Sequence, residues 1–198
     1  MKKTLILLLT AIIMSFTGNV QAQLTFDKGF KGGMTYSNLI LEPESVFDYS
    51  YNPGMIAGFY LETGILKYFS VQGELLFSQK GAKYKMAQEV NIRLNYVEVP
   101  ILFKLNIPVI PAFLFNINGG PYFGLKISEN WSGSNILPNT DLFKRSDYGF
   151  VIGGGIKVDA FLKYICLDVR YSQSLKHIYN DIGEVNNKQL AITLGIGF

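Results

Sequence analysis

Leu190-Ala-Ile-Thr-Leu-Gly-Ile-Gly-Phe198, the end of the 198-residue sequence, alternates without a break between large apolar side chains and small or polar ones. The large set comprises Leu190, Ile192, Leu194, Ile196 and Phe198. Successive side chains on a strand point to opposite faces, so this stretch predicts a β-strand with one oily face. The stretch ends on an aromatic residue without a polar tail. This ending favours a barrel whose oily face meets lipid.

The first 22 residues have the pattern of a secretory signal peptide. A basic start, an apolar core and compact residues before the cleavage point follow in order, at Lys2 and Lys3, Leu5–Phe16 and Val20–Ala22. The alternative is an N-terminal membrane helix, but the apolar run is shorter than the ~20 residues that span a bilayer. We therefore expect a signal peptide over residues 1–22 and a mature barrel domain over residues 23–198.

Composition argues against several classes of function. Removing Lys2 and Lys3 lowers the formal net charge from +3 to about +1, and no basic cluster remains, so we expect no nucleic-acid partner. The single cysteine, Cys166, cannot form an internal disulfide; we expect a shielded thiol, with intermolecular pairing as the alternative. One histidine and one cysteine do not make a convincing zinc site, and we expect no cofactor.

The mature sequence is apolar but contains no clean membrane helix. Its richest apolar run, 97–117, includes Pro100, Pro108 and Pro111, which break a helix. Only helices and closed barrels satisfy their backbone hydrogen bonds in lipid. The chain is therefore expected to cross the membrane with strands.

Eight segments separated by turn signals read as strands, at Gly29–Leu39, Pro53–Thr63, Tyr68–Lys80, Ile92–Lys104, Ala112–Ile127, Ser146–Val158, Tyr164–Leu175 and Lys188–Phe198. Short connections at Gly64–Lys67, Asn106–Pro111 and Asp159–Lys163 alternate with longer ones at Ile40–Asn52, Gly81–Asn91, Ser128–Arg145 and Lys176–Asn187. Short periplasmic turns and long outer loops are typical of outer-membrane barrels. The fold class predicted is all-β, an eight-stranded antiparallel up-and-down transmembrane barrel with both termini on the periplasmic side.

The fourth segment departs from simple alternation. Ile92, Leu94 and Tyr96 have one parity, whereas Val97 and Val99 begin a run with the other. A β-bulge near Tyr96 would bring both halves onto one oily face, and we expect one there.

A soluble lipocalin-like barrel would show the same alternation with its oily face inward. Charge placement decides between the two arrangements. The charged residues fall on the face opposite the oily one, at Lys31, Glu62, Glu74, Glu98, Lys104, Lys157, Asp168 and Arg170. The nearly uncharged, aromatic-rich face suits lipid better than water, which favours the membrane barrel.

Five pieces of the sequence together resemble the porin-like or PorT-like outer-membrane β-barrel family common in Bacteroidota. They are Gly29-Phe-Lys-Gly-Gly-Met-Thr-Tyr-Ser-Asn38, Val71-Gln-Gly-Glu-Leu-Leu-Phe-Ser-Gln-Lys-Gly81, Tyr96-Val-Glu-Val-Pro-Ile-Leu-Phe-Lys104, Gly119-Gly-Pro-Tyr-Phe-Gly124 and Leu167-Asp-Val-Arg-Tyr-Ser172. The resemblance implies an OmpA/OmpX-like barrel in the bacterial outer membrane and no single biochemical activity. The terminal pattern ending in Phe198 also resembles the signal read by the barrel-assembly machinery.

An eight-stranded barrel has an interior just wide enough for its own side chains. The eight charged residues named above would lie there, and buried charges must be paired or hydrogen-bonded. We expect a structural ion network that plugs the lumen. The alternative is a selective constriction in a narrow diffusion channel.

Three further features of the sequence can be interpreted as either structural or functional. Gly153-Gly-Gly155 precedes more strand, so we expect it to make room in the lumen and not to cradle phosphate. His177 would support a rim-active enzyme, but its segment holds no second carboxylate to work with it as acid or base. We therefore expect a loop residue and no catalytic site. Tyrosines and one tryptophan near strand ends, at Tyr36, Tyr60, Tyr68, Tyr84, Tyr96, Trp131, Tyr148 and Tyr164, predict an interfacial belt, with carbohydrate stacking on Trp131 as the alternative.

The sequence thus predicts a monomeric, non-enzymatic envelope protein. Its expected partners are outer-membrane lipid, the assembly machinery during insertion, and an envelope protein or surface ligand held by the outer loops. The loop 128–145 is the first place to look for such a contact.

Overall fold

The computed structural model describes residues 25–42, 49–85, 89–132, 144–160, 163–175 and 184–198. Within them the chain forms eight strands and no helix. The strands are β1 (Phe26–Glu42), β2 (Tyr49–Leu66), β3 (Phe69–Lys85), β4 (Glu89–Ile110), β5 (Phe113–Ser132), β6 (Ser146–Asp159), β7 (Tyr164–Ser174) and β8 (Glu184–Gly197). None of the described residues lies in a helix with the length and hydropathy to cross a bilayer.

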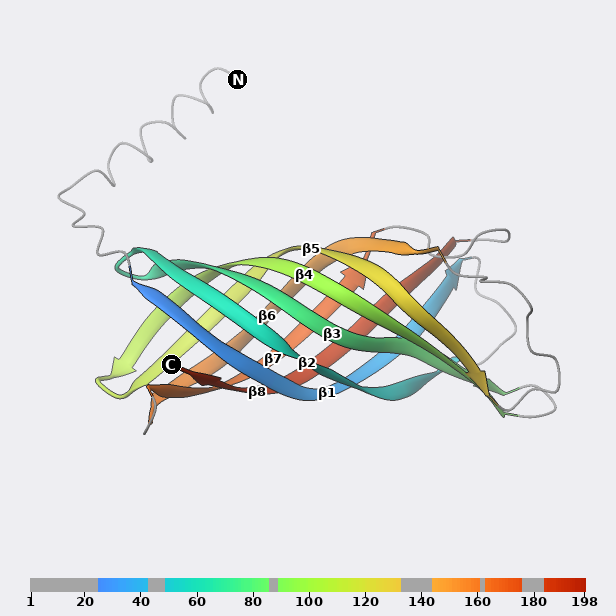
Figure 1. Ribbon diagram of the computed structural model, residues 1–198, viewed down its shortest axis with the longest axis horizontal. Coiled ribbons are helices and arrows are strands. Elements are labelled where there is room, and N and C mark those ends of the chain that lie inside the picture. Colours follow the sequence, from blue (N-terminus) through green and yellow to red (C-terminus); the bar gives the residue numbers. More distant parts are fainter. Residues whose placement is uncertain (1–24, 43–48, 86–88, 133–143, 161–162, 176–183) are drawn as a thin grey trace, which may run out of the picture.

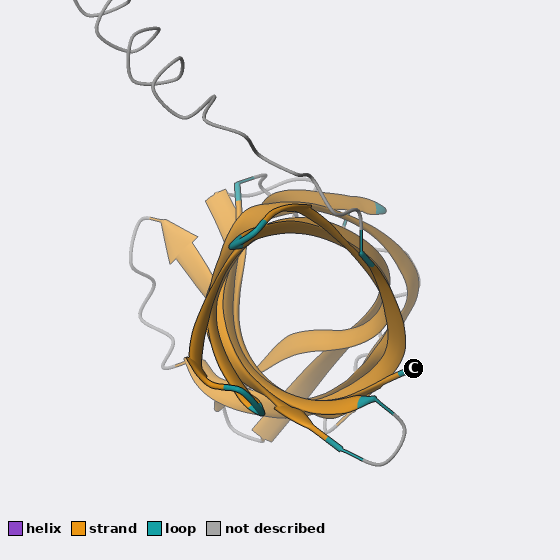
Figure 2. Cartoon of the chain, turned by 90° about the vertical axis from the view of Figure 1, so that its left-hand side faces the viewer, coloured by secondary structure: helices purple, strands orange, loops and turns teal. Residues whose placement is uncertain are grey.

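Each strand pairs antiparallel with the next along the chain, and β8 returns to pair with β1. The sheet is therefore a closed barrel with up-and-down order, as Figures 1 and 2 show. We call the end with the turns Lys67–Tyr68 and Pro111–Ala112 the turn end, and the opposite end the loop end. The first described residues of β1 and the last residue, Phe198, both lie at the turn end (Figure 1).

The eight-stranded prediction is confirmed, and most of the strands are longer than expected. The clearest correction is the connection predicted over Gly81–Asn91. There β3 runs to Lys85 and β4 starts at Glu89, and the pairing continues outward to Lys85↔Glu89. Polar residues that end the apolar pattern predict a loop, yet a hairpin that projects into water needs no apolar outer face.

The predicted parity slip in β4 is wrong. Its even-numbered residues face the lumen along most of the strand, from Ile92, Leu94 and Tyr96 to Lys104. What changes at Tyr96 is the polarity of the two faces, because Asn91, Arg93 and Asn95 replace apolar residues on the outside. An apolar inner face with a polar outer face is expected where a barrel stands in water.

The register between β4 and β5 does shift at the predicted place, but the extra residue is on the other strand. Asn95 pairs with Ser128 and Tyr96 pairs with Lys126, so Ile127 is left without an opposite partner. This bulge changes the parity of β5, and Ser128 joins the exposed Ile127 on the outer side. Pairing partners cannot be read from the alternation of one strand alone.

Below Tyr96 the outer face of β4 is apolar without interruption, at Val97, Val99, Ile101, Phe103, Leu105, Ile107 and Val109. Phe103, near the middle of this run, is 62% exposed. At 3.3 Å per residue and a tilt of ~40°, the run spans ~30 Å along the barrel axis, close to the thickness of the hydrocarbon layer. A lipid-facing wall accounts for such exposure, whereas a lipocalin-like barrel would bury these side chains.

Candidate functional site: the charged lumen

A cluster of four charged side chains from three strands lies in the middle of the lumen. Lys31 Nζ of β1 lies 2.8 Å from Glu74 Oε1 of β3 and 3.1 Å from Asp168 Oδ2 of β7. Arg170 of β7 contacts the same two acids, through Nη1 at 2.6 Å from Glu74 Oε2 and Nη2 at 3.3 Å from Asp168 Oδ2. All four residues are buried, so two cations and two carboxylates neutralise one another.

Gln72 connects this cluster to a second group nearer the turn end. Its amide nitrogen donates to Glu74, and its carbonyl oxygen accepts from Lys104 Nζ at 2.8 Å. Lys104 Nζ also lies 3.0 Å from Glu62 Oε2, and Ser70 Oγ donates to Glu62 Oε1 at 2.6 Å. One neutral amide therefore joins two sets of ion pairs.

The chain of contacts continues to the rim of the turn end. Lys157 Nζ lies 3.4 Å from Glu62 Oε2 and 3.2 Å from Asp27 Oδ2, and Lys163 Nζ reaches Asp27 Oδ1 at 2.5 Å. We call this connected set the inner network: Asp27, Lys31, Glu62, Gln72, Glu74, Lys104, Lys157, Asp168 and Arg170. It contains four acids and four bases, so its formal charge is balanced before the half-exposed Lys163 is counted.

Seven of the eight charged residues predicted for the lumen fall in the inner network, and Glu98 does not. Glu98 Oε1 lies 2.5 Å from Lys80 Nζ, nearer the loop end. Lys80 Nζ also lies 3.1 Å from Asp147 Oδ2, which accepts a hydrogen bond from Tyr122 Oη at 3.1 Å. Ser174 Oγ donates to Asp147 Oδ1 at 2.5 Å. These five residues form what we call the outer network.

Lys80, Asp147 and Asp27 belong to the two networks, and the sequence analysis did not include them among the lumen charges. The signal for Lys80 was present, since it continues the even-numbered inward series of Gln72 and Glu74 on β3. Asp147 likewise shares the inward parity of β6. Both lie at the edge of the segments first assigned as strands, where a charge reads equally well as the start of a loop.

Apolar side chains separate the two networks. Leu102 and Val151 pack with Tyr122 of the outer network, and Ile56, Leu76 and Ala191 form a second group. On β3, Leu76 lies between Glu74 of the inner network and Lys80 of the outer network. The lumen is thus filled in layers, ionic, apolar and ionic.

Three tyrosines expected in the interfacial belt lie in the lumen instead. Tyr60 and Tyr164 are buried near the turn end, where Tyr60 Oη donates to Tyr164 Oη at 3.2 Å. Tyr96 is fully buried near the loop end. These tyrosines share the parity of inward charged neighbours, as Tyr60 does with Glu62, and parity therefore predicts that they face the lumen. Proximity to a strand end does not. Tyr148 is exposed on the outer face, as a belt residue should be.

The lumen near the turn end also holds Cys166, which is free and buried beside Tyr60 and Tyr164. Glycines make room for these side chains. A β-carbon at Gly197 would stand 2.1 Å from the ring of Tyr164, and one at Gly195 would stand 2.6 Å from Cys166 Sγ. Small residues on β8 are therefore the counterpart of large ones on β7.

The same reasoning applies to the glycine run of β6. A β-carbon at Gly155 would stand 2.2 Å from Asp168 Oδ1 of the inner network. Gly153 and Gly155 lie within a strand that pairs with both β5 and β7. Strand structure on both sides of the run leaves no helix start for a phosphate, and the glycines serve the packing of the lumen.

The remaining candidates lie elsewhere. His177 falls outside the described residues, and within them no group of His, Cys, Asp and Glu could hold a metal ion. Trp131 is partly buried, and its Nε1 donates to Glu129 Oε1 at 2.8 Å. The centre of the loop 128–145, residues 133–143, is likewise outside the described part of the chain.

The predicted assembly signal forms the outer face of β8, with exposed side chains at Leu190, Ile192, Leu194, Ile196 and Phe198. The Phe198 ring lies 5.6 Å from that of Phe30 on β1, and the Phe198 amide donates to the Lys28 carbonyl at 2.9 Å. The last residue is thus part of the wall at the β1–β8 seam.

Comparison with known proteins agrees with the geometry. Three solved structures with a similar backbone are OprG from Pseudomonas aeruginosa, Ail from Yersinia pestis and Neisserial surface protein A. OprG is 11% identical with a TM-score of 0.56, over 91% of this chain and 99% of OprG. Ail is 11% identical (TM-score 0.44, 87% of this chain and 98% of Ail), and the Neisserial protein 10% identical (TM-score 0.48, 87% and 97%).

No curated protein sequence gives a significant match. The sequence model of the family described as "Outer membrane protein beta-barrel domain" matches residues 21–180, most of the chain. The closed barrel with an oily outer face agrees with that description. The chain therefore belongs to the outer membrane protein beta-barrel domain family, and it is a β-barrel protein of the bacterial outer membrane.

Proposed function

We propose that this protein is a closed-lumen barrel that presents its loop end at the cell surface as a structural or interaction protein of the envelope. It acts as a monomer and has no catalytic site. The observation that carries the proposal is the inner network, because most of its charges are buried and all are already paired with one another. The loops, including 128–145, would then hold any envelope protein or surface ligand.

The inner network is a poor ion-selective constriction. A selective pore offers a passing ion ligands that it can take up and release. Here Glu74 Oε1 is occupied by Lys31 and Gln72, and Glu74 Oε2 by Arg170. A permeating ion would have to displace these partners and leave buried charges unpaired, at a cost of several kcal/mol for each.

The apolar layer adds a second obstacle. Leu102 is fully buried and Leu76 nearly so, and both lie between the two networks. A narrow apolar section resists filling with water, which ions need in order to pass. This layer also weakens the alternative function, a narrow diffusion channel for small solutes.

Planar-bilayer recording tests the proposal. We expect the folded protein to give no steady conductance, and we expect the same of Lys163→Met, a control at the exposed end of the network. The Glu74→Ala/Arg170→Ala variant, which empties the centre, should give small, irregular openings. Reproducible nanosiemens openings of the unaltered protein would establish the channel instead. Heat-dependent gel mobility shows in each case that the inserted protein is folded.

Two finer assignments belong to this proposal. We infer that residues 1–22 are removed on export and that the mature protein begins at Gln23. The intact mass of the mature protein measures this start. The five sequence pieces named above support membership of the porin-like branch found in Bacteroidota. The oily face of β8, ending in Phe198, is the segment we propose for recognition by the assembly machinery.

A further inference from the structure

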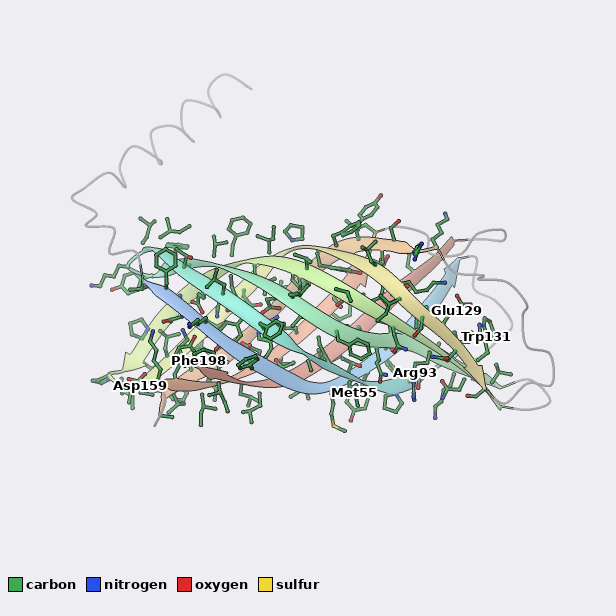
Figure 3. All side chains as sticks on the ribbon, in the orientation of Figure 1. Met55, Arg93, Glu129, Trp131, Asp159 and Phe198 are labelled. Carbon is green, nitrogen blue, oxygen red and sulfur yellow. The ribbon has the colours of Figure 1, made fainter. Side chains whose placement is uncertain are left out.

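A polar row lies on the outside of the barrel immediately beyond the apolar wall, at the loop end. On β4 it consists of Asn95 and Arg93, which lie beyond Val97 in the direction of the loop end. Arg93 points outward because its neighbours Ile92 and Leu94 are buried on the lumen side. At ~3.3 Å per residue and a tilt of ~40°, Arg93 stands ~10 Å above Val97 along the axis, near the level of lipid headgroups. Figure 3 shows it between Met55 and Trp131 along the barrel.

The neighbouring strands mark the same level. Gly81 of β3 is the partner of Arg93, and the adjacent Ala82 pairs with Tyr51 of β2. Tyr51 is 63% exposed on the outer face, where tyrosine favours the headgroup layer. Gly81 has a φ of 141°, in the region that favours glycine, and a β-carbon there would stand 2.0 Å from the Ile92 carbonyl oxygen.

Arg93 Nε is buried without a hydrogen-bond partner, and the guanidinium makes no ion pair with another residue in the described part of the chain. Among the loop-end side chains that the structure describes, Lys83 points outward on the neighbouring strand β3 and Lys188 on the distant β8, and no acidic side chain does. An unpaired guanidinium presents a planar fork of donors that matches the oxygens of a phosphate. The outer face at this level is therefore complementary to an anion.

Polar neighbours complete the surface. Asn130 of β5 is directly opposite Arg93 and exposed, and Asn95 Nδ2 donates to Ser128 Oγ at 2.6 Å one row below. Under this row the wall is apolar, with Ile127 57% exposed. A ligand with a phosphate at one end and acyl chains at the other fits both parts at once.

We propose that Arg93, with Asn130 and the Asn95–Ser128 pair, binds the phosphate of a lipid headgroup in the outer leaflet, with the acyl chains lying on Val97 and Ile127. The ligand is a phosphorylated lipid and not a free anion, because the polar row is continuous with the lipid-facing wall. This assignment is independent of whether the lumen conducts.

Native mass spectrometry of the folded full-length mature protein in uncharged detergent tests the proposal, with short-chain phosphatidic acid as the probe. Diacylglycerol of the same chain length and inorganic phosphate are the comparison ligands. The variants are Arg93→Gln, Arg93→Lys and Lys67→Gln. The last removes the same charge from the turn end, at a residue exposed beside Tyr68.

We expect the unaltered protein and Lys67→Gln to bind phosphatidic acid equally, and Arg93→Gln to lose about tenfold or more in affinity. Arg93→Lys should fall between them because it keeps the charge and loses the fork. Equal losses in Arg93→Gln and Lys67→Gln, or no loss in either, would overturn the site. Inorganic phosphate or diacylglycerol binding as tightly as the phosphatidic acid would overturn the lipid phosphate as its ligand. Arg93→Lys carries the comparison if Arg93→Gln does not fold.

Discussion

Glu74 shows most directly how a charged residue is accommodated inside a membrane barrel. Both of its oxygens are occupied, and its partners come from β1, β3 and β7. Burying an ion pair stabilises a protein little, because the cost of desolvation offsets the attraction, whereas breaking one is costly. The inner network therefore adds little stability itself, but each of its buried charges requires its partners in order to stay paired.

This dependence can be measured at Arg170. Replacing Arg170 with Met leaves Glu74 and Asp168 short of a cation, and we expect a loss of about 3–5 kcal/mol in the free energy of unfolding. Adding Glu74→Gln to Arg170→Met should recover part of the loss, because the unpaired charge is removed. Urea titration in lipid vesicles, read by the gel mobility of the folded form, gives both values.

Lys163→Met is the matched control, since it removes one positive charge from a pair whose lysine is 48% exposed. Exposed pairs contribute about 0–1 kcal/mol. If Arg170→Met and Lys163→Met destabilise equally, the charges at the centre of the lumen are solvated and the network is not a plug.

Cys166 reports on the closure of the turn end. The thiol is buried beside Tyr60 and Tyr164, so a membrane-impermeant maleimide should not label the folded protein. Labelling should become complete after unfolding in urea, because the thiol is then exposed. Rapid labelling of the folded barrel, followed by mass spectrometry, would show that water and solutes enter the lumen from this end.

At the scale of the element, β4 records where the barrel leaves the lipid. Its side chains keep one parity from Ile92 to Lys104, but the apolar face changes from outside to inside at Tyr96. A lysine placed outward below this point must enter hydrocarbon, and one placed outward above it remains in water or headgroups.

Two substitutions on the same face of β4 test this boundary. Ile101→Lys should destabilise the barrel by about 2–4 kcal/mol, the cost found for lysine near the middle of a bilayer, and Asn95→Lys by about 0–1 kcal/mol. Urea titration in vesicles measures both. Similar losses at the two positions would place the membrane boundary elsewhere on the strand.

The same strand shows what the sequence could and could not predict. The alternation of apolar and polar residues was sufficient to count the strands and to predict that Lys31 of β1, Glu62 of β2 and Arg170 of β7 share the inward face. It was not sufficient in β4, because a change of environment and a change of parity leave the same trace in a sequence. The bulge at Ile127 emerges only from pairing two strands.

Partner choice within the lumen was beyond sequence reasoning for a geometric reason. Lys31 and Asp168 are 137 residues apart, and they meet because β8 pairs with both β1 and β7. Charges on strands with the same inward parity are all candidates for one another until the register is fixed. Glu98 is buried and forms its ion pair with Lys80, which also contacts Asp147, and parity alone does not reveal this partnership.

At the scale of the whole molecule, the seam between β1 and β8 unites the parts of the barrel. It holds the terminal aromatic residue, with Phe198 against Phe30 on the outside. On the inside, the pairs Lys31–Asp168 and Lys157–Asp27 join the two halves of the chain near the seam. These pairs cannot form while the sheet is open.

An unclosed sheet entering the bilayer would carry Lys31 and Asp168 without each other, at a cost of several kcal/mol for each ion. Insertion and cylinder formation are consequently coupled through electrostatics as well as through backbone pairing. A nascent chain therefore gains by turning its charged side chains inward early, around trapped water. It then enters the lipid only as β1 and β8 pair and close the barrel. The ion pairs that fill the lumen of the closed barrel thus also raise the free energy of every partly closed barrel.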